Sequence, residues 1–151
     1  MRPLLSSRIL VRCVEWIGWG IGMAGLTLYY AVPSRGMVAH WMLEELGQPF
    51  DKHLLSLDAG DHKTEAFLAL NPMGRVPVLT HGDQVVTETA AIVTYLADAF
   101  PDANLGLPLD SPLRADYLRW IFFATNSAEP SILRKAMGEL KVVDEPWSDV
   151  K

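Results

Sequence analysis

The sequence has very few of the residues that build disulfide frameworks or cysteine metal sites. Its 151 residues contain one cysteine, Cys13, which excludes a disulfide framework, a CxxC redox motif and a cysteine metal site. No run of lysine or arginine occurs, and the formal net charge is −5. Since phosphate binding needs clustered basic side chains, we expect no nucleic-acid partner. The sequence also predicts no bound metal, and an anionic ligand would have to be held by a local site.

Charged residues are also absent from one run near the start of the chain. Three arginines precede an uncharged run at 16–32, which superficially suggests a signal or anchor segment. Glycines interrupt this run, Glu15 stands at its edge, and a membrane span needs about 20 apolar residues. Residues 26–30 are moreover needed as a first strand. We therefore expect residues 1–25 to be a disordered extension, with Met23 as the natural start. A membrane or export role is the other interpretation.

Half of the residues are hydrophobic, and their spacing predicts a sequence of short elements around a core. Residues 26–30 (LTLYY) are typical of a buried strand. Apolar residues then recur at helical spacing over 36–46, and Met37 and Trp41 are expected in the core. A second strand is predicted at 50–55. Because a strand–helix–strand unit of this length needs a right-handed crossover, the two strands should be parallel.

The segment NPMGRVPVLTHGDQVVTETAA at 71–91 contains the most structural signals in the sequence, including a proline within a predicted strand. After a short helix and a tight turn, this segment predicts a strand at 76–80, a Gly-Asp hairpin, a strand at 84–86 and a helix at 88–100. Proline removes a ladder donor, so the first of these strands needs a sheet edge or a special backbone geometry. A cis Val76–Pro77 bond is one such geometry. It would leave the N–H and C=O of Val76 free.

Two further helices are predicted after this segment. Residues 101–110 look like a linker between domains. Ser111 and Pro112 are a helix start, and the apolar stripe that follows continues past Trp120. We expect this helix to end at Glu129–Pro130, and another to occupy residues 132–140.

The motifs GRVPVL and TETAAI, joined by the Gly-Asp hairpin, resemble the glutathione-binding half of the cytosolic glutathione transferases, in particular bacterial and theta-like or beta-like members. The resemblance extends from about residue 26 to about residue 130. It implies an α/β fold, with a thioredoxin-like domain (βαβαββα, mixed sheet) at 26–100 followed by part of an all-helical domain at 111–151. Because family members have several more helices, we expect this second domain to be truncated.

The resemblance implies a detoxifying reaction in which glutathione, as co-substrate, is conjugated through its thiolate to a small hydrophobic electrophile. It also implies a cytoplasmic protein that pairs as a homodimer. A non-catalytic glutathione-binding or protein-interaction module of the same fold is the alternative, because fold alone does not settle function. A glutaredoxin-like oxidoreductase is excluded, since no cysteine stands at the start of the first helix.

Ser34 is the first candidate for the catalytic group. The thiolate is the nucleophile of thiol chemistry, and hydrogen bonds and helix N-termini both stabilise it. Ser34 stands where both effects act, although the same position suits a helix cap worth about 1 kcal/mol. Tyr30, together with Tyr29, provides the alternative hydroxyls.

The next candidates are residues that would bind the γ-glutamyl end and the backbone of glutathione. Glu88 and Thr89 open a helix, where an anion is favoured, and the resemblance gives the γ-glutamyl amine to the first and its carboxylate to the second. Val76, beside Pro77, is expected to bind the peptide through its main chain, as in strand addition.

Two basic residues and one aromatic residue complete the predicted site. Arg75 and His62 are the candidates for the glycyl carboxylate, since a guanidinium fork suits a carboxylate; a solvated loop position is the other interpretation of His62. Trp120, with Phe122 and Phe123, would line an apolar site for the electrophile or, alternatively, belong to the core.

Overall fold

A four-stranded mixed sheet forms the centre of the protein. The computed structural model describes residues 25–136 and 138, so the predicted extension, apart from residue 25, lies outside the described residues. The strands are β1 (Leu26–Tyr30), β2 (Phe50–Leu54), β3 (Val78–His81) and β4 (Gln84–Thr87). They lie in the order β2-β1-β3-β4. β1 is parallel to β2 and antiparallel to β3, which is antiparallel to β4. The predicted thioredoxin-like βαβαββα order is confirmed.

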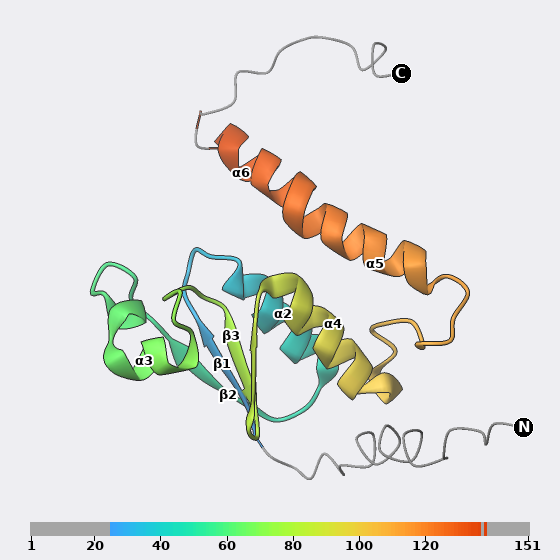
Figure 1. Ribbon diagram of the computed structural model, residues 1–151, viewed down its shortest axis with the longest axis horizontal. Helices are drawn as coiled ribbons and strands as arrows, with labels where there is room; N and C mark the ends of the chain where they lie inside the picture. Colours follow the sequence, from blue (N-terminus) through green and yellow to red (C-terminus); the bar gives the residue numbers. More distant parts are fainter. Residues whose placement is uncertain (1–24, 137, 139–151) are drawn as a thin grey trace, which may run out of the picture.

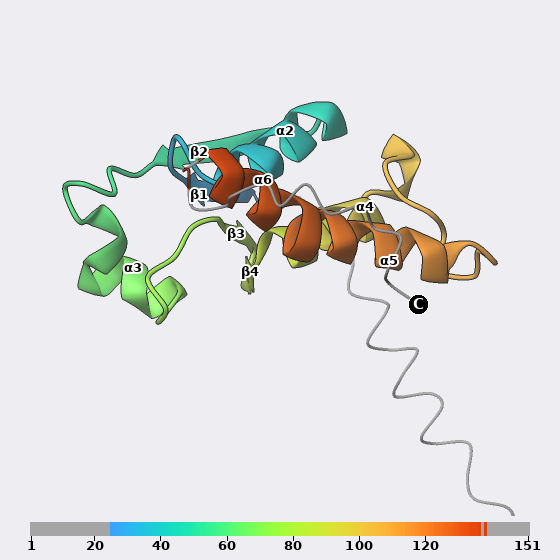
Figure 2. The ribbon, with the colours of Figure 1, turned by 90° about the horizontal axis from the view of Figure 1, so that it is seen from above.

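The helices cover both faces of this sheet (Figures 1 and 2). α2 (Gly36–Leu46) and α4 (Thr89–Ala99) pack on one face, and α3 (Glu65–Leu70), after the 3₁₀ turn η1 (Asp61–Lys63), lies on the other. The core fills the space between the sheet and the helix pair. Its fully buried side chains come from β1, β3, α2 and α4: Leu28, Leu79, Leu43, Ile92 and Leu96.

The prediction that Met37 and Trp41 belong to the core is wrong. Their exposed fractions are 50% and 68%. α2 instead turns its small and branched residues, Ala39 and Leu43 among them, toward the sheet. The Trp41 indole N–H lies on the outside of the helix and donates to Glu45 Oε1 at 2.8 Å.

One long helix follows the linker, where two were predicted (Figure 1). α5 (Arg114–Phe123) continues through the π-helical turn η3 (Ala124–Ala128) into α6 (Glu129–Ala136). A proline within an α-helix normally clashes with the carbonyl four residues earlier. Here the wider turn precedes Pro130, and the Glu129 N–H donates to the Ala124 carbonyl, five residues back. The predicted break at Glu129–Pro130 is therefore wrong, and the end of the predicted helix at 132–140 lies outside the described residues.

The linker, which includes η2 (Pro101–Ala103), fits closely against α4 and α5. The Arg114 guanidinium donates to both carboxylate oxygens of Asp98, at 2.9 and 2.7 Å, and to the Leu107 carbonyl at 2.6 Å. A Cβ at Gly106 would lie 2.8 Å from the Ala97 Cβ. The domain boundary at 101–110 stays a prediction. Across residues 25–136, no helix has both the length and the apolar character needed to span a membrane.

A polar pair, in which His81 is buried and Tyr95 half-buried, lies at the end of β3 that leads into the hairpin. His81 is 6% exposed, its Nδ1 lies 2.9 Å from the Tyr95 hydroxyl, and its ring stacks on Phe100 at 5.7 Å. Burial lowers the pKa of His81 and raises the pKa of Tyr95. Both groups are therefore neutral near pH 7, and protonation of the imidazole opposes folding.

We expect acid to destabilise the fold through His81. Between its folded pKa and the unfolded value of about 6.5, the unfolded chain binds a proton that the folded chain does not, so the free energy of unfolding falls as the pH falls through this window. Urea unfolding from pH 8 to 5 should show a smaller fall for His81→Gln. His53→Gln, which removes an exposed histidine, is the control. Identical pH slopes for wild type and His81→Gln would contradict this.

Candidate functional site

Three connections of the fold meet at one end of the sheet, here called its edge: the end where β1 and β4 finish and β3 begins. β3 runs antiparallel to both neighbours, and Val78 pairs with Tyr29 on β1 and with Thr87 on β4. The segment before β3, the turn after β1 and the start of α4 therefore lie at the same edge (Figure 1). This arrangement brings the predicted residues Ser34, Val76 and Glu88 to one place.

The segment before β3 is held by the side chain of Asn71. Asn71 is 6% exposed; its amide N–H donates to the Arg75 carbonyl at 2.8 Å and its carbonyl accepts from the Met73 N–H at 3.2 Å. The Val76–Pro77 peptide bond is cis. The strand ladder begins at Val78, and no backbone hydrogen bond among the described residues outside helices and strands involves Val76. Its N–H and C=O are thus available to an extended peptide.

A basic corner lies beside this turn. Gly74 has φ +59°, and a Cβ there would lie 2.9 Å from the His62 carbonyl oxygen and 2.8 Å from Lys63 Nζ. Lys63 Nζ also donates to the Gly74 carbonyl at 3.5 Å. His62 Nδ1 is buried without a hydrogen-bond partner among the described residues. Arg75, which is exposed, follows directly, so the two predicted carboxylate ligands stand on adjoining segments.

The start of α4 is polar and incompletely satisfied. Glu88, the exposed N-cap residue, has φ +69° and makes no side-chain capping bond. For a non-glycine residue such a conformation costs on the order of 1–3 kcal/mol and is concentrated at functional sites. Thr89 is 4% exposed, and its Oγ1 has no hydrogen-bond partner in the described part of the chain. Buried hydroxyls are almost always hydrogen-bonded, so this hydroxyl needs a water or a ligand group as its partner.

Ser34 lies in the turn that opens α2. Its hydroxyl donates to the Ala31 carbonyl at 2.6 Å and accepts from the Gly36 N–H at 3.0 Å. The N-cap position itself belongs to Arg35, which makes no side-chain capping bond. The Ser34 oxygen is thus fixed by the first N–H of the helix, close to the positive end of the helix dipole.

The tyrosine alternatives occupy different surroundings. Tyr30 packs against the hydrophobic core, and its ring centroid lies 4.9 Å from that of His40. Tyr29 stacks on His53 at 4.8 Å. Of these three hydroxyls, the one on Ser34 stands at a helix N-terminus.

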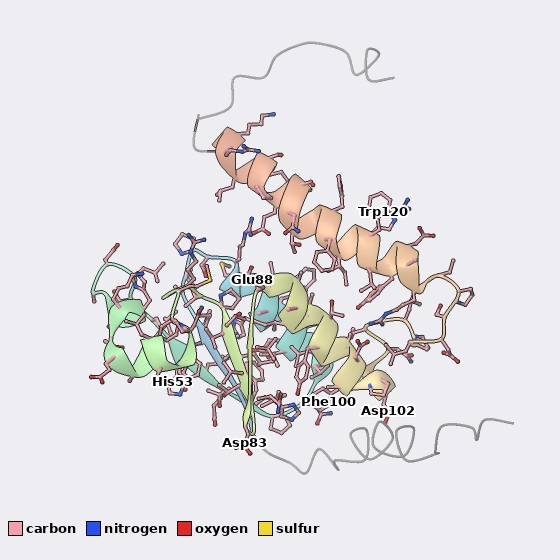
Figure 3. All side chains as sticks on the ribbon, viewed as in Figure 1. His53, Asp83, Glu88, Phe100, Asp102 and Trp120 are labelled. Carbon is pink, nitrogen blue, oxygen red and sulfur yellow. The ribbon has the colours of Figure 1, made fainter. Side chains whose placement is uncertain are left out.

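Trp120 is not brought to this edge. It is 60% exposed and points away from Glu88 (Figure 3). Together with Leu113, Tyr117 and Ile121 it lines an open apolar groove of about 630 Å³ along α5. Phe122 and Phe123 are half exposed. The groove is a separate feature from the polar edge of the sheet.

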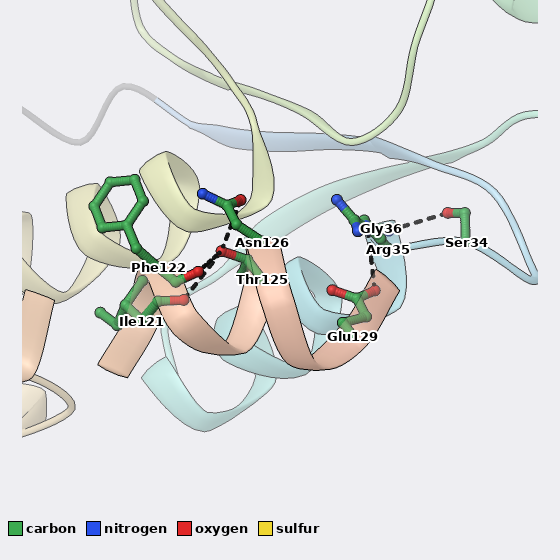
Figure 4. A network of polar contacts seen from close by, with 8 residues as sticks. All are labelled: Ser34, Arg35, Gly36, Ile121, Phe122, Thr125, Asn126 and Glu129. Carbon is green, nitrogen blue, oxygen red and sulfur yellow. Dashed lines mark hydrogen bonds and ion pairs between the residues drawn. The ribbon is translucent and has the colours of Figure 1, made fainter. Parts of the chain in front are cut away.

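Sequence reasoning placed the turn at Asn71 but missed the two hydrogen bonds of its side chain, which the Asn-Pro-x-Gly pattern is able to signal. It also missed an ion pair between Arg35 and Glu129, with Nε and Oε1 3.2 Å apart (Figure 4). No local pattern indicates that pair, because its partners lie far apart in the sequence.

The comparisons with known proteins agree with the fold and the motifs. Residues 24–98 match the family model "Glutathione S-transferase, N-terminal domain". Glutathione S-transferase 1 of Dianthus caryophyllus is 40% identical over 84 residues, covering 56% of this chain and 38% of that protein. Glutathione S-transferase theta-1 of Bos taurus is 35% identical over 100 residues, covering 64% and 42%. The chain thus spans less than half the length of these relatives.

A solved glutathione transferase structure has a similar fold. The crystal structure of a glutathione transferase homologue from Sulfitobacter, with bound glutathione, has a TM-score of 0.65 and 26% identity. The superposition covers 83% of this chain and 60% of that one. The structural similarity therefore extends past the sheet domain into the helical segment.

We expect Gly36 to tolerate no side chain. An added Cβ would lie 2.7 Å from the Tyr30 Cβ and 3.0 Å from Ser34 Oγ, so Gly36→Ala should lower the free energy of unfolding by about 1–3 kcal/mol. Urea denaturation measures this. Gly25→Ala is the control, since a Cβ there meets nothing within 4 Å. If the clash were absent, alanine would raise helix propensity and stability, and that outcome would refute the close contact.

Proposed function

We propose that the protein binds glutathione at the end of the sheet formed by Val76, Glu88 and Thr89 and conjugates its thiolate to small electrophiles. The match of residues 24–98 to the glutathione S-transferase N-terminal domain supports this proposal. The observation that carries the proposal is the Thr89 hydroxyl, which is buried and has no hydrogen-bond partner among the described residues. It stands at the N-terminus of α4, where an anionic carboxylate is favoured.

The charges of the edge match those of glutathione, which has two carboxylates and one amine. In the proposed complex, Glu88 binds the γ-glutamyl amine and Thr89 the adjoining carboxylate. The main chain of Val76 pairs with the cysteinyl peptide unit, as a strand pairs with a sheet edge. His62 and Arg75 bind the glycyl carboxylate at the other end, where Lys63 adds a further positive charge.

Ser34 is the proposed catalytic residue. A serine hydroxyl has one hydrogen to donate, and in the present arrangement that hydrogen goes to the Ala31 carbonyl. Donation to the thiolate therefore requires the hydroxyl to rotate away from Ala31, while the Gly36 N–H still fixes the oxygen. The resulting hydrogen bond lowers the thiol pKa, because it stabilises the charged form. Tyr30 is the less suitable donor, since its ring packs against the core.

The electrophile, the location and the assembly state belong to the same proposal. We infer a small hydrophobic electrophile, a cytoplasmic location and pairing as a homodimer, as in the family resemblance. Trp120 and its groove provide an open apolar surface along α5. The second candidate function is a non-catalytic glutathione-binding module. The bond from Ser34 to Ala31 favours it, because that bond occupies the hydroxyl.

Reduced glutathione should bind the wild-type protein and bind Thr89→Val weakly. A hydrogen bond to a charged group is worth about 1.5–3 kcal/mol, which corresponds to a loss of affinity on the order of tenfold to a hundredfold. Titration calorimetry measures it, with Thr89→Ser as the matched control that keeps the hydroxyl. Glu88→Ala should weaken binding as well. Equal affinities for wild type and Thr89→Val would remove Thr89 from the site.

Ser34→Ala should bind glutathione normally but turn over slowly. The lost hydrogen bond to the thiolate predicts a fall in kcat of roughly 10- to 100-fold, measured with glutathione and an aromatic electrophile. Tyr30→Phe, which removes only the alternative hydroxyl, should retain the wild-type kcat. A wild-type protein that binds glutathione without any turnover would establish the binding module, and full activity of Ser34→Ala would exclude Ser34 from catalysis.

A further inference from the structure

The turn that contains Ser34 is tied to the helical segment by one ion pair. Arg35 is the residue after Ser34 and the N-cap of α2. Its Nε lies 3.2 Å from Oε1 of Glu129 on α6, and the two side chains are 37% and 33% exposed (Figure 4). Figure 1 shows α6 above the start of α2 with a gap between the two ribbons, and Figure 4 shows the Arg35 and Glu129 side chains meeting between them. The helical segment thus reaches the edge that contains the candidate site.

The π-helical turn ahead of Glu129 sets the direction of this side chain. An α-helix turns by about 100° per residue, so the extra residue in a π turn rotates everything that follows. In η3 the Glu129 N–H donates to the Ala124 carbonyl, and the Thr125 hydroxyl donates to the Ile121 carbonyl at 3.0 Å. Such π turns are frequent at functional sites. With regular α-helical winding from Ala124 onward, Glu129 would face a different direction.

Arg35 in turn fixes the groups that orient the Ser34 hydroxyl. The Arg35 carbonyl accepts from the Val38 N–H at 3.1 Å and the Ser34 carbonyl from the Met37 N–H at 3.1 Å. The neighbouring Gly36 N–H donates to Ser34 Oγ. A shift of Arg35 therefore moves the donor that orients this oxygen.

We propose that Glu129 is a positioning residue, which acts through Arg35 to hold the Ser34 turn in place for thiol activation. The proposal rests on the proposed function. The glutathione anchors Val76, Glu88 and Thr89 belong to other elements and make no bond to either partner of the pair among the described contacts. The pair therefore affects activation of the thiol and leaves glutathione binding intact.

The test is a double-mutant cycle on the full chain with Glu129→Ala, Arg35→Ala, the two together, and the exchanged pair Arg35→Glu with Glu129→Arg. A partly exposed ion pair is worth up to about 1 kcal/mol, so each single change should lower kcat by up to about fivefold, with KM for glutathione within about twofold of wild type. The double change should cost no more than one single change, and the exchanged pair should recover most of kcat. Glu129→Gln serves if Glu129→Ala does not fold.

Lys52→Ala is the matched control, because it removes the ion pair from Lys52 to Glu44 (3.3 Å) at the other end of α2. It should leave kcat unchanged. Additive losses in the cycle, a rise in KM equal to the fall in kcat, or no recovery in the exchanged pair would overturn the proposal.

Amide hydrogen exchange of residues 31–38 separates this inference from the proposed function. Exchange should be about fivefold faster in Glu129→Ala and return to the wild-type rate in the exchanged pair. If the wild-type protein neither binds nor turns over glutathione, the proposed function fails. The exchange measurement then decides alone whether Glu129 holds the turn, and unchanged exchange in Glu129→Ala overturns it.

Discussion

The pairing of β3 with both of its neighbours is the constraint on which the rest of the structure depends. Val78 is fully buried and stands opposite Tyr29 on β1 and Thr87 on β4. A shift by one residue would turn every side chain of β3 to the opposite face of the sheet. It would also separate the ends of β1 and β4. The same register therefore fixes the core and the edge where the candidate site lies.

Much of this fold is predictable because local signals and tertiary packing agree. The run LTLYY forms a strand and the helix over 36–46 has the predicted bounds. The strand predicted at 76–80 is the informative exception, since β3 begins at Val78. Proline gives no ladder donor, and the residues before it are held by Asn71. Sequence spacing thus predicts that a turn is followed by a strand here, but it does not show at which residue the turn ends and the strand begins.

The errors concern contacts between distant segments. An apolar residue on a helix fits either a core or an open surface, and only the packing of α2 shows that Trp41 is outside. Proline at 130 predicts a break, but a π turn avoids the clash and the helix continues. Motifs identify the candidate residues Ser34, Val76 and Glu88. The lack of a partner for the Thr89 hydroxyl among the described residues and the Arg35–Glu129 pair depend instead on three-dimensional packing.

In the proposed site, glutathione binding and thiol activation depend on two different parts of the molecule. The proposed ligand anchors lie at the ends of β3, β4 and α4, whose positions the buried core fixes. The hydroxyl of Ser34 lies in a turn whose neighbour Arg35 is bound to α6. Under the proposal, affinity for glutathione depends on the sheet domain, and reactivity of its thiol depends also on the helical segment. Because the two depend on different contacts, loss of one leaves the other measurable.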